Sequence, residues 1–518
     1  MTPEVVALAV TPPADVVERL VGDTVASRIA AGDTTVWPRA ARPGWVRAAR
    51  GARPLVGEIE GLHERLRVAG LTRVVLAAAG GVGVAAEVIA AAGIVATRLV
   101  VLDGTDPVQV ADALAGDLDA TVLVVSAPPG EDTAAVELLW DTVASAFRAD
   151  GLDPDVHTVL VTAPDGPLLG RVGRATTVLG PSDVDGPWAA FTAFALVPAG
   201  LAGADVGVLL ADASETGPAL ADDHPDNPAL TVGALLAQAP LVAVAGAGPL
   251  AEWVAQLLAG GLGKDGRGPL PVLLEAPDAP GWSAPGVLTV AVDGAGADGV
   301  GPTDVGTDGP AAAQLLLWLH ATAVAAHLLG VDPTDRPDTR IPVAGAVAGA
   351  VAVPTCTDGP RFVDGPRFVD GMVDVHGGDW LPSETVTVAG ALRALLDGTD
   401  GDPDHLAVHA YLDPHDDASA AVLRPELTRR TGLVTTFGWA PRCLPGTGQR
   451  DKGGPAGGVV CQVTGSGRPG EDPLGALQIE QARADAAALA ERGRRVLRLH
   501  LTDRVVGLVT LVRAVQQL

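Results

Sequence analysis

The sequence contains little positive charge and only two lysines, Lys264 and Lys452. Its 35 lysine and arginine side chains are outnumbered by 62 aspartate and glutamate side chains, so the formal net charge is −27 at pH 7. Nucleic acid and anionic membranes repel a chain this acidic, so neither is expected as a partner. The chain would also repel an anionic substrate unless a local basic pocket compensates.

Cysteine is scarce as well. Cys356, Cys443 and Cys461 are odd in number and far apart, and no C-x-x-C pattern is present. This argues against a disulfide framework and against a zinc site. The first residues, M-T-P-E-V-V-A-L-A-V, contain no basic region, so a signal peptide is not expected. The sequence therefore predicts a reduced, cytoplasmic protein.

The histidines do not form a metal-binding pattern. His405, His409 and His415 lie close together in the sequence, but no second cluster of ligands accompanies them. Packed or solvated histidines are therefore expected. No metal and no other cofactor is predicted.

Two uncharged stretches, residues 231–251 and 309–331, approach the length of a membrane span. They contain polar or helix-breaking residues such as Gln238, Pro249 and His320, so we expect both to be buried core elements of a soluble protein. With 518 residues, of which 48% are hydrophobic, the chain can form a sizeable core and two or three domains.

Short apolar strands alternate with helical stretches through the middle of the chain, which is typical of a doubly wound parallel sheet with helices on both faces. The predicted strands are 73–77, 98–102, 121–126, 158–162 and 176–179 in a first unit, and 241–245, 272–275 and 288–292 in a second. A helix is predicted near the amino terminus at 16–31. A helix, a strand and a helix are predicted at 474–491, 496–501 and 505–518.

The central feature of the sequence is the stretch 121–133, T-V-L-V-V-S-A-P-P-G-E-D-T. A loop after such a strand lies at the carboxyl edge of the sheet, where open α/β folds bind ligands, and the next helix points its positive end at it. Two prolines in this loop lack N–H donors. Glu131 and Asp132 add two carboxylates, which disfavour an anionic ligand.

Several separated motifs occur in a consistent order. They are A-A-A-G-G-V-G-V-A-A-E-V (77–88), L-D-G-T-D-P-V-Q-V (102–110), the stretch 181–203, W-V-A-Q-L-L-A-G-G-L-G-K-D-G (253–266) and W-A-P-R-C-L-P-G-T-G-Q-R-D-K-G-G-P (439–455). They resemble motifs of the sugar isomerase family, and within it the glucose-6-phosphate isomerases of the long actinobacterial type.

The resemblance implies an α/β fold with two sugar-isomerase-type (flavodoxin-like) domains, which are doubly wound parallel sheets. We predict a helical segment at 1–56, a first such domain at 57–220, a second at 221–395 and a mixed C-terminal α/β extension at 396–518. The activity implied is the interconversion of glucose 6-phosphate and fructose 6-phosphate. The family is commonly dimeric, so a homodimer is a further implication.

The resemblance also places the catalytic positions, and this sequence departs from the family at each of them. Gly260 stands where the family has its base, and Pro187 where an arginine stabilises the enediol. Pro445 stands at the position assigned to the ring-opening histidine, and Val343 at that of a lysine. None of these side chains can take up the corresponding role, so no catalytic residue is assigned. The remaining candidates for binding in the crevice are Gly80, Gly81, Ser126, Gly130, Thr133, Lys264, Gln449 and Lys452.

Three functional hypotheses remain open. The first is a catalytically degenerate relative with a regulatory or scaffolding role, in complex with pentose-phosphate or glycolytic enzymes. The second is an active isomerase that uses other residues: Glu252, Asp265 or Asp451 as base, and Lys264, Arg442 or Lys452 as cation. The third is a module that binds a different small molecule in the same crevice. Glu131 and Asp132 facing a shared pocket would favour the third hypothesis, and the same side chains turned to solvent would favour the first.

Overall fold

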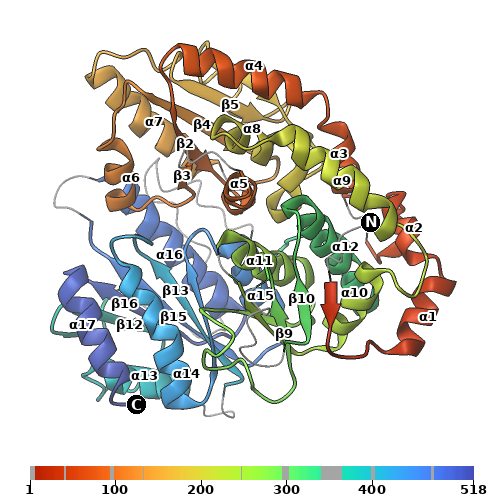
Figure 1. Cartoon of the computed structure of the whole chain (residues 1–518). Helices are drawn as coiled ribbons and strands as arrows, with labels where there is room; N and C mark the ends of the chain where they lie inside the picture. Colours follow the sequence, from red (N-terminus) through yellow and green to blue (C-terminus); the bar gives the residue numbers. More distant parts are fainter. Residues whose placement is uncertain are drawn as a thin grey trace.

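The computed structural model describes residues 6–39, 42–93, 99–131, 133–246, 248–294, 303–339, 365–397, 403–467 and 472–518. In these residues, helices pack around three β-sheets (Figure 1). The predicted α/β fold with doubly wound parallel sheets is confirmed.

The first sheet is parallel throughout and has the strand order β3-β2-β4-β5-β6, which is the flavodoxin-like order. All residues of β4 are buried, because it is a central strand. Ser126 of β4 pairs with Ala78 of β2 and with Val161 of β5, so the loops after β2 and β4 meet at the carboxyl edge. The elements are β2 (Arg73–Ala78), α5 (Val82–Ala91), β3 (Leu99–Leu102), α6 (Pro107–Leu114), β4 (Thr121–Ala127), α7 (Ala134–Ala149), β5 (Thr158–Thr162), β6 (Thr176–Leu179) and α8 (Ala193–Leu201).

The second sheet has the order β1-β10-β9-β7-β8. Four of its strands are parallel, and the amino-terminal strand β1 (Val6–Leu8) joins β10 in an antiparallel pair. The other elements of this region are η2 (Gly186–Phe191), α9 (Val206–Leu220), α10 (Pro228–Gln238), β7 (Leu241–Ala245), α11 (Pro249–Leu262), β8 (Leu270–Leu274), β9 (Val287–Ala291), β10 (Val305–Thr307) and α12 (Ala311–Leu329).

The amino-terminal helices differ from the prediction in one respect. The single helix predicted at 16–31 is two helices, α1 (Ala14–Gly22) and α2 (Val25–Ala30). The chain turns between them at Thr24, which has a left-handed backbone with φ of 53° that an α-helix cannot continue through. The helices η1 (Thr34–Val36), α3 (Gly44–Gly51) and α4 (Leu55–Val68) follow.

The carboxyl-terminal third forms a mixed sheet of its own, with the order β11-β12-β16-β15-β13-β14. Strands β11 and β12 precede residue 396, the predicted start of the C-terminal extension, yet β12 pairs with β16 in this sheet. The elements are β11 (Phe368–Asp370), β12 (Val373–Gly377), α13 (Val388–Leu396), β13 (His405–Tyr411), η3 (Ala418–Val422), α14 (Leu423–Thr431), β14 (Val434–Trp439), η4 (Leu444–Gly448), α15 (Gln449–Gly453), β15 (Gly458–Gly465), α16 (Pro473–Glu491), β16 (Val496–Leu501) and α17 (Arg504–Val515).

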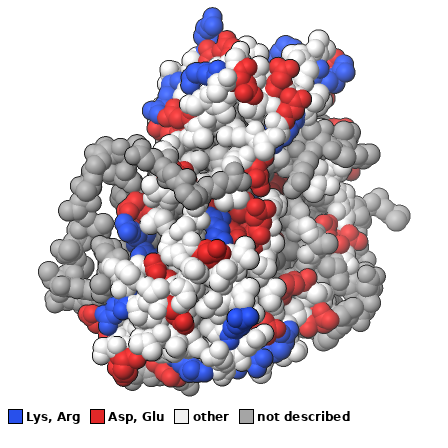
Figure 2. Space-filling model, turned by 90° about the vertical axis from the view of Figure 1, so that its left-hand side faces the viewer, with Lys and Arg blue, Asp and Glu red and all other residues white. Residues whose placement is uncertain are grey.

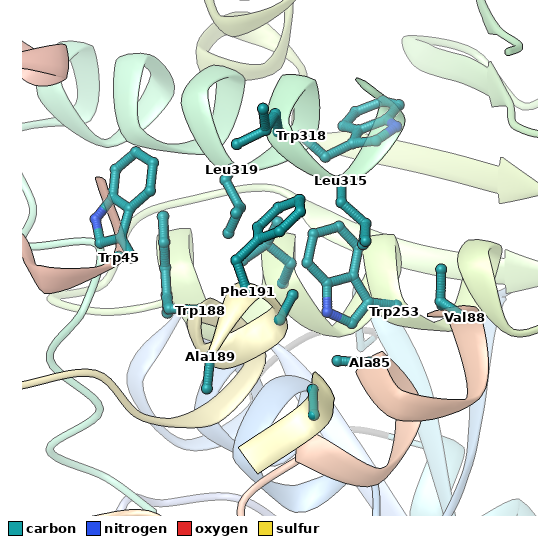
Figure 3. Close-up of a cluster of buried hydrophobic side chains, with 14 of the residues drawn as sticks. Trp45, Ala85, Val88, Trp188, Ala189, Phe191, Trp253, Leu315, Trp318 and Leu319 are labelled. Carbon is teal, nitrogen blue, oxygen red and sulfur yellow. The ribbon is translucent and has the colours of Figure 1, made fainter. Parts of the chain in front are cut away.

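The largest hydrophobic core joins the first two sheets. The close-up in Figure 3 shows Trp45 of α3, Trp188 and Phe191 of η2, Trp253 of α11 and Trp318 of α12 packed together. Each of these side chains is at most 2% exposed. Large aromatic side chains at the junction of several helices hold the first two sheets in a fixed arrangement.

One helix in the described residues, α12, is long and apolar enough to cross a membrane. In its most apolar window, however, 83% of the residues are buried inside the protein. The helix begins two residues after the start of the predicted core stretch 309–331 and has the burial of a core helix of a soluble protein.

Both lysines are buried, Lys264 at 1% and Lys452 at 4% exposure. The basic side chains visible in Figure 2 are therefore arginines. Most of them lie toward the upper and lower parts of that face, and acidic side chains gather near its middle. The surface accordingly offers no lysine to an anionic partner.

Candidate functional site

The predicted site begins at the glycine turn after β2. Gly80 and Gly81 both have left-handed backbones, with φ of 72° and 82°, and the turn leads directly into α5. The side chain of Glu131, from the loop after β4, lies over this turn, because a Cβ added to Gly80 would overlap its carboxyl group. The space beside the turn, at the carboxyl edge of the sheet, is therefore filled by a carboxylate of the chain itself.

Arg336 holds Glu131 in this position. Its guanidinium donates to Glu131 and to Asp185 Oδ1, at 3.1 Å for the latter, and its side chain is only 7% exposed. Arg42 donates to the other oxygen of Asp185 at 3.1 Å. Burial opposes the charge of Arg336, but the two adjacent carboxylates outweigh it and raise the pKa of this guanidinium. Glu131 therefore belongs to an internal ion cluster, and its side chain is 13% exposed. It is not turned to solvent, which was the arrangement expected under the first hypothesis, so that criterion does not favour the first hypothesis.

The other predicted residues of this loop have structural roles. Ser126 is fully buried, and its hydroxyl donates to the carbonyl of Phe194 at 2.9 Å. The hydroxyl of Thr133 donates to Glu137 Oε1, also at 2.9 Å, within the first turn of α7. Gly130 has a left-handed backbone with φ of 78°. Asp132 lies outside the described residues.

Gly260 and Pro445, to whose positions the resemblance assigns the base and the ring-opening group, lie against each other. A Cβ added to Gly260 would lie 2.8 Å from the backbone oxygen of Pro445. A Cβ added to Gly446 would lie 2.7 Å from the Cα of Gln256. Glycines on both sides thus allow the backbones of α11 and η4 to touch, and no room for a sugar remains between them.

Pro187 lies beside the glycine turn, because a Cβ added to Gly81 would lie 3.7 Å from its ring and 3.6 Å from Gln256 Oε1. Pro187 is buried within η2. Gly81, Pro187 and Gln256 are thus brought together from the glycine turn, η2 and α11. Val343 lies outside the described residues.

Lys264 and Gln449 both bind the segment 332–338. Lys264 Nζ donates to the carbonyls of Asp332, at 2.7 Å, and of Asp335. Burial lowers the pKa of Lys264 to about 8. The side-chain amide of Gln449 donates to Asp338 Oδ2 at 2.8 Å and accepts from the N–H of Asp338 at 2.9 Å. These two motif residues fix a loop.

Lys452 belongs to a buried charge network that includes two of the histidines. Its ammonium contacts Asp485, and both side chains are 0% exposed. His409 Nε2 lies 2.8 Å from Asp451 Oδ2, and its Nδ1 lies 3.5 Å from Asp485 Oδ2. His405 Nε2 lies 3.8 Å from Asp451. Alternating positive and negative groups thus surround one another in the core of the third sheet.

Of the alternative bases and cations, Glu252 and Arg442 come together. Arg442 Nε donates to Glu252 at 2.8 Å, and the same guanidinium donates to Asp103 at 2.9 Å and to Glu87. Asp451 and Lys452 lie in the buried network, and Asp265 pairs with Arg39 at 3.3 Å. The sequence motifs contain Glu87 and Asp103, but only the structure brings them to Arg442.

Comparisons with known proteins show a partial similarity to probable glucose-6-phosphate isomerases. The probable glucose-6-phosphate isomerase of Haloarcula marismortui is 35% identical over 187 residues, which are 33% of this chain and 42% of that protein. The probable enzyme of Halobacterium salinarum is 35% identical over 185 residues, with the same shares of 33% and 42%. About a third of the chain is thus similar to probable glucose-6-phosphate isomerases. Its matches span less than half the length of these relatives, and no family model matches it.

A solved structure shows the same fold. The crystal structure of a hypothetical protein of Thermus thermophilus superimposes with a TM-score of 0.54 at 19% identity, and it covers 66% of this chain and 100% of that one. The sequence matches thus show the similarity to probable glucose-6-phosphate isomerases, and this structural match shows only that the fold is shared.

The buried network gives a prediction for the pH dependence of stability. Burial would lower the pKa of His409, but its contacts with Asp451 and Asp485 raise it from 6.5 to about 9. At pH values between these two pKa values, His409 of the folded protein keeps a proton that the unfolded chain has lost. The free energy of unfolding therefore falls as pH rises. At about 1.4 kcal/mol per pH unit for one proton, we expect a loss of up to about 2 kcal/mol over the lower 1.5 units of this range.

Urea unfolding at a series of pH values measures this slope. The lower part of the range is the better test, because Lys264, whose pKa is lowered to about 8, acts in the opposite direction at higher pH. The slope should disappear in a His409→Gln variant. A wild-type protein whose stability stays constant or rises between pH 6.5 and about 8 would contradict the assignment.

Proposed function

We propose that this chain is a catalytically inactive relative of glucose-6-phosphate isomerases, of the long type that its motifs resemble. Its role is regulatory or scaffolding, in the cytoplasmic metabolism of sugar phosphates. Enzymes that act on sugar phosphates in the pentose-phosphate or glycolytic routes are the expected partners, and a homodimer is the expected assembly.

The observation that carries the proposal is the position of Glu131. Its carboxylate lies over Gly80 at the carboxyl edge of the first sheet, where the family holds the phosphate of its substrate. Arg336, the cation at this place, is already shared by Glu131 and Asp185. A phosphate dianion entering here would meet two carboxylates and a neutralised guanidinium, so its binding is disfavoured.

The contact between α11 and η4 supports the same proposal. Isomerisation needs a base near the C2 proton and a group that opens the ring, both within hydrogen-bonding distance of the substrate. Here Gly260 and Pro445 stand at those positions and touch through their backbones. The loss of one base or one stabilising donor typically lowers a rate by about 10²–10⁴-fold.

Activity through other residues is the alternative, and Glu252 with Arg442 is the pair that favours it. The two side chains line one cavity, and Glu252 is 26% exposed. Arg442, however, already donates to three carboxylates, so it is not free to stabilise an enediolate. We therefore keep the inactive relative as the proposed function.

An isomerase assay tests the proposal. With fructose 6-phosphate as substrate and a glucose-6-phosphate dehydrogenase as coupling enzyme, we expect turnover at least ~10⁴-fold below the typical enzyme value of about 10 s⁻¹. Millimolar glucose 6-phosphate should not raise the melting temperature, because only a ligand bound by the folded state stabilises it. Turnover near the typical value would overturn the proposal.

A Glu131→Gly variant provides the matched comparison. It removes the carboxylate above Gly80 and leaves Arg336 paired with Asp185 alone. Millimolar inorganic phosphate should then raise the melting temperature of the variant but not of the wild-type protein. Equal shifts in the two proteins would show that Glu131 does not exclude phosphate.

A further inference from the structure

A cavity of about 850 Å³ lies where the three sheets meet. Its walls come from α5 and β3 of the first sheet, from α11 and β8 of the second, and from α14, β14 and η4 of the third. Its volume falls within the range of small-molecule sites. Along α11 the cavity is lined by residues between 249 and 256, and Gly260 lies about one turn beyond them toward the carboxyl end of the helix.

One end of the cavity carries excess negative charge. Arg442 donates to Glu87, Asp103 and Glu252, and its side chain is 14% exposed. Three carboxylates against one guanidinium leave two negative charges without compensation. Glu87 and Glu252 line the cavity and are 28% and 26% exposed, so their oxygens can reach a ligand.

The other end of the cavity is electrically balanced. Arg424 is 2% exposed and pairs with Glu275, with 2.7 Å between Nε and Oε1. The remaining nitrogen of its guanidinium, Nη1, donates to the carbonyl of Pro280 at 3.0 Å. The electrostatic field in the cavity therefore attracts a cation toward Glu87 and Glu252.

An aromatic pair completes the wall. Phe437 and Trp439 alternate with Gly438 along β14, so both side chains lie on the same face of the strand. Their ring centroids are 5.0 Å apart with an interplanar angle of 86°. Aromatic residues make up only 3% of this chain, and two of them meet at this cavity. Their faces attract cations and apolar groups.

We propose that this cavity binds a small organic cation, whose ammonium group meets Glu87 and Glu252 and whose apolar part lies against Phe437 and Trp439. Glu252 accepts two hydrogen bonds from Arg442 and one from Gln256, at 2.9 Å, and Glu87 accepts from Arg442. Because a carboxylate offers about four acceptor positions, both retain capacity for an ammonium group. An anion of the same shape meets the uncompensated charge and is excluded. The proposal is independent of whether the chain has isomerase activity.

The surroundings of Asp103 favour a further positive charge nearby. Burial, together with the neighbouring Glu87 and Glu252, raises the pKa of Asp103 to about 6 despite the contact with Arg442. A second positive charge near these carboxylates would relieve this repulsion.

Titration calorimetry with three probes of matched shape tests the proposal on the full chain. The probes are phenethylamine, which is a cation, 2-phenylethanol, which is neutral, and phenylacetate, which is an anion. We expect the amine to bind at least about tenfold more tightly than the alcohol, and the anion to give no detectable heat. Equal or tighter binding of phenylacetate, or no binding of the amine at millimolar concentration, would overturn the proposal.

Two variants locate the binding site. Ala421, at the cavity wall, is half-buried and takes no part in the charge cluster, so Ala421→Phe narrows the cavity without removing a charge. Glu252→Gln removes one of the two carboxylates expected to meet the ammonium group. Both should weaken phenethylamine binding about tenfold or more, whereas Glu480→Gln, an exposed site on α16, should leave it unchanged. Unaltered binding in the Ala421→Phe protein, with its melting temperature retained, would place the ligand elsewhere and refute the proposal.

Discussion

Substitution of Lys452 by methionine is expected to lower the free energy of unfolding by about 3–5 kcal/mol, the typical effect of leaving a buried charge without its partner. Lys452 on α15 and Asp485 on α16 are both 0% exposed. In the Lys452→Met protein, Asp485 would retain Gln462, which donates at 3.0 Å, and the histidine His409 at 3.5 Å. The positive charge of His409 is shared between Asp451 and Asp485, so without Lys452 the carboxylate of Asp485 is left undercompensated in the core.

Urea unfolding of single and double variants measures this effect. Removal of both charges in Lys452→Met/Asp485→Leu should recover part of the loss, because apolar replacements of a buried pair are often nearly neutral. Arg483→Met is the control, since Arg483 pairs with Glu480 on the same helix at 44% and 42% exposure. Its effect should stay below about 1 kcal/mol. A loss of similar size in the control would show that burial is not the cause.

This experiment also bears on function, because Lys452 was expected in a ligand-binding crevice. The motif around it is recognisable in the sequence, but a motif does not tell whether its lysine meets a ligand or a neighbouring carboxylate. Asp485 lies 33 residues further along the chain by their numbers, on another helix, and no local pattern connects the two. Burial of a charge depends on such long-range partners, which a single sequence does not reveal.

Much of the fold, by contrast, could be predicted from the sequence. Strands β5, β6, β7 and β16 begin and end at the predicted residues, because each is a short apolar or β-branched run between turn-forming residues. The cap of α6 is also local: Asp106 accepts from the N–H of Val108 at 2.9 Å, and Pro107 begins the helix. Local chemistry determines these features.

Features that depend on distant contacts were harder to predict. The left-handed residue Thr24 divides the predicted helix at 16–31, although threonine gives no signal for that conformation. The pairing of β12 with β16 joins segments more than a hundred residues apart, so the composition of the third sheet could not be read from the sequence. At the site, the sequence showed Gly260 and Pro187 at the positions that the resemblance assigns to a base and an arginine, but it did not show the partner of Glu131. Arg336 is 205 positions away.

The second large effect concerns Gly260 itself. Gly260→Ala is expected to lower the free energy of unfolding by about 1–3 kcal/mol, although alanine is the better helix former by about 1 kcal/mol. The reason is that the new Cβ would lie 2.8 Å from the oxygen of Pro445 and 3.4 Å from the Cα of Gly446. Both are backbone atoms, so relief requires α11 and η4 to move apart.

Gly57 in α4 is the matched control, because a Cβ added there meets no atom within 4 Å. Gly57→Ala should stabilise the protein by about 0.5–1 kcal/mol, the usual gain for such a change in a helix. Urea unfolding of the two alanine variants therefore compares the same substitution at Gly57, where the new Cβ has free space, and at Gly260, where it meets other backbone atoms. Equal effects would contradict the close contact between α11 and η4.

Gly260→Glu extends the same argument to catalysis. It supplies the carboxylate that the family uses as base, but the side chain must displace the backbone of η4 and bury a charge. We expect a loss of at least about 3 kcal/mol in the free energy of unfolding and no isomerase turnover. The phosphate position is still filled by Glu131, and Pro445 still lacks a group that could open the ring. Turnover in this single variant would mean that α11 and η4 separate in solution and that the crevice between them still admits a sugar phosphate.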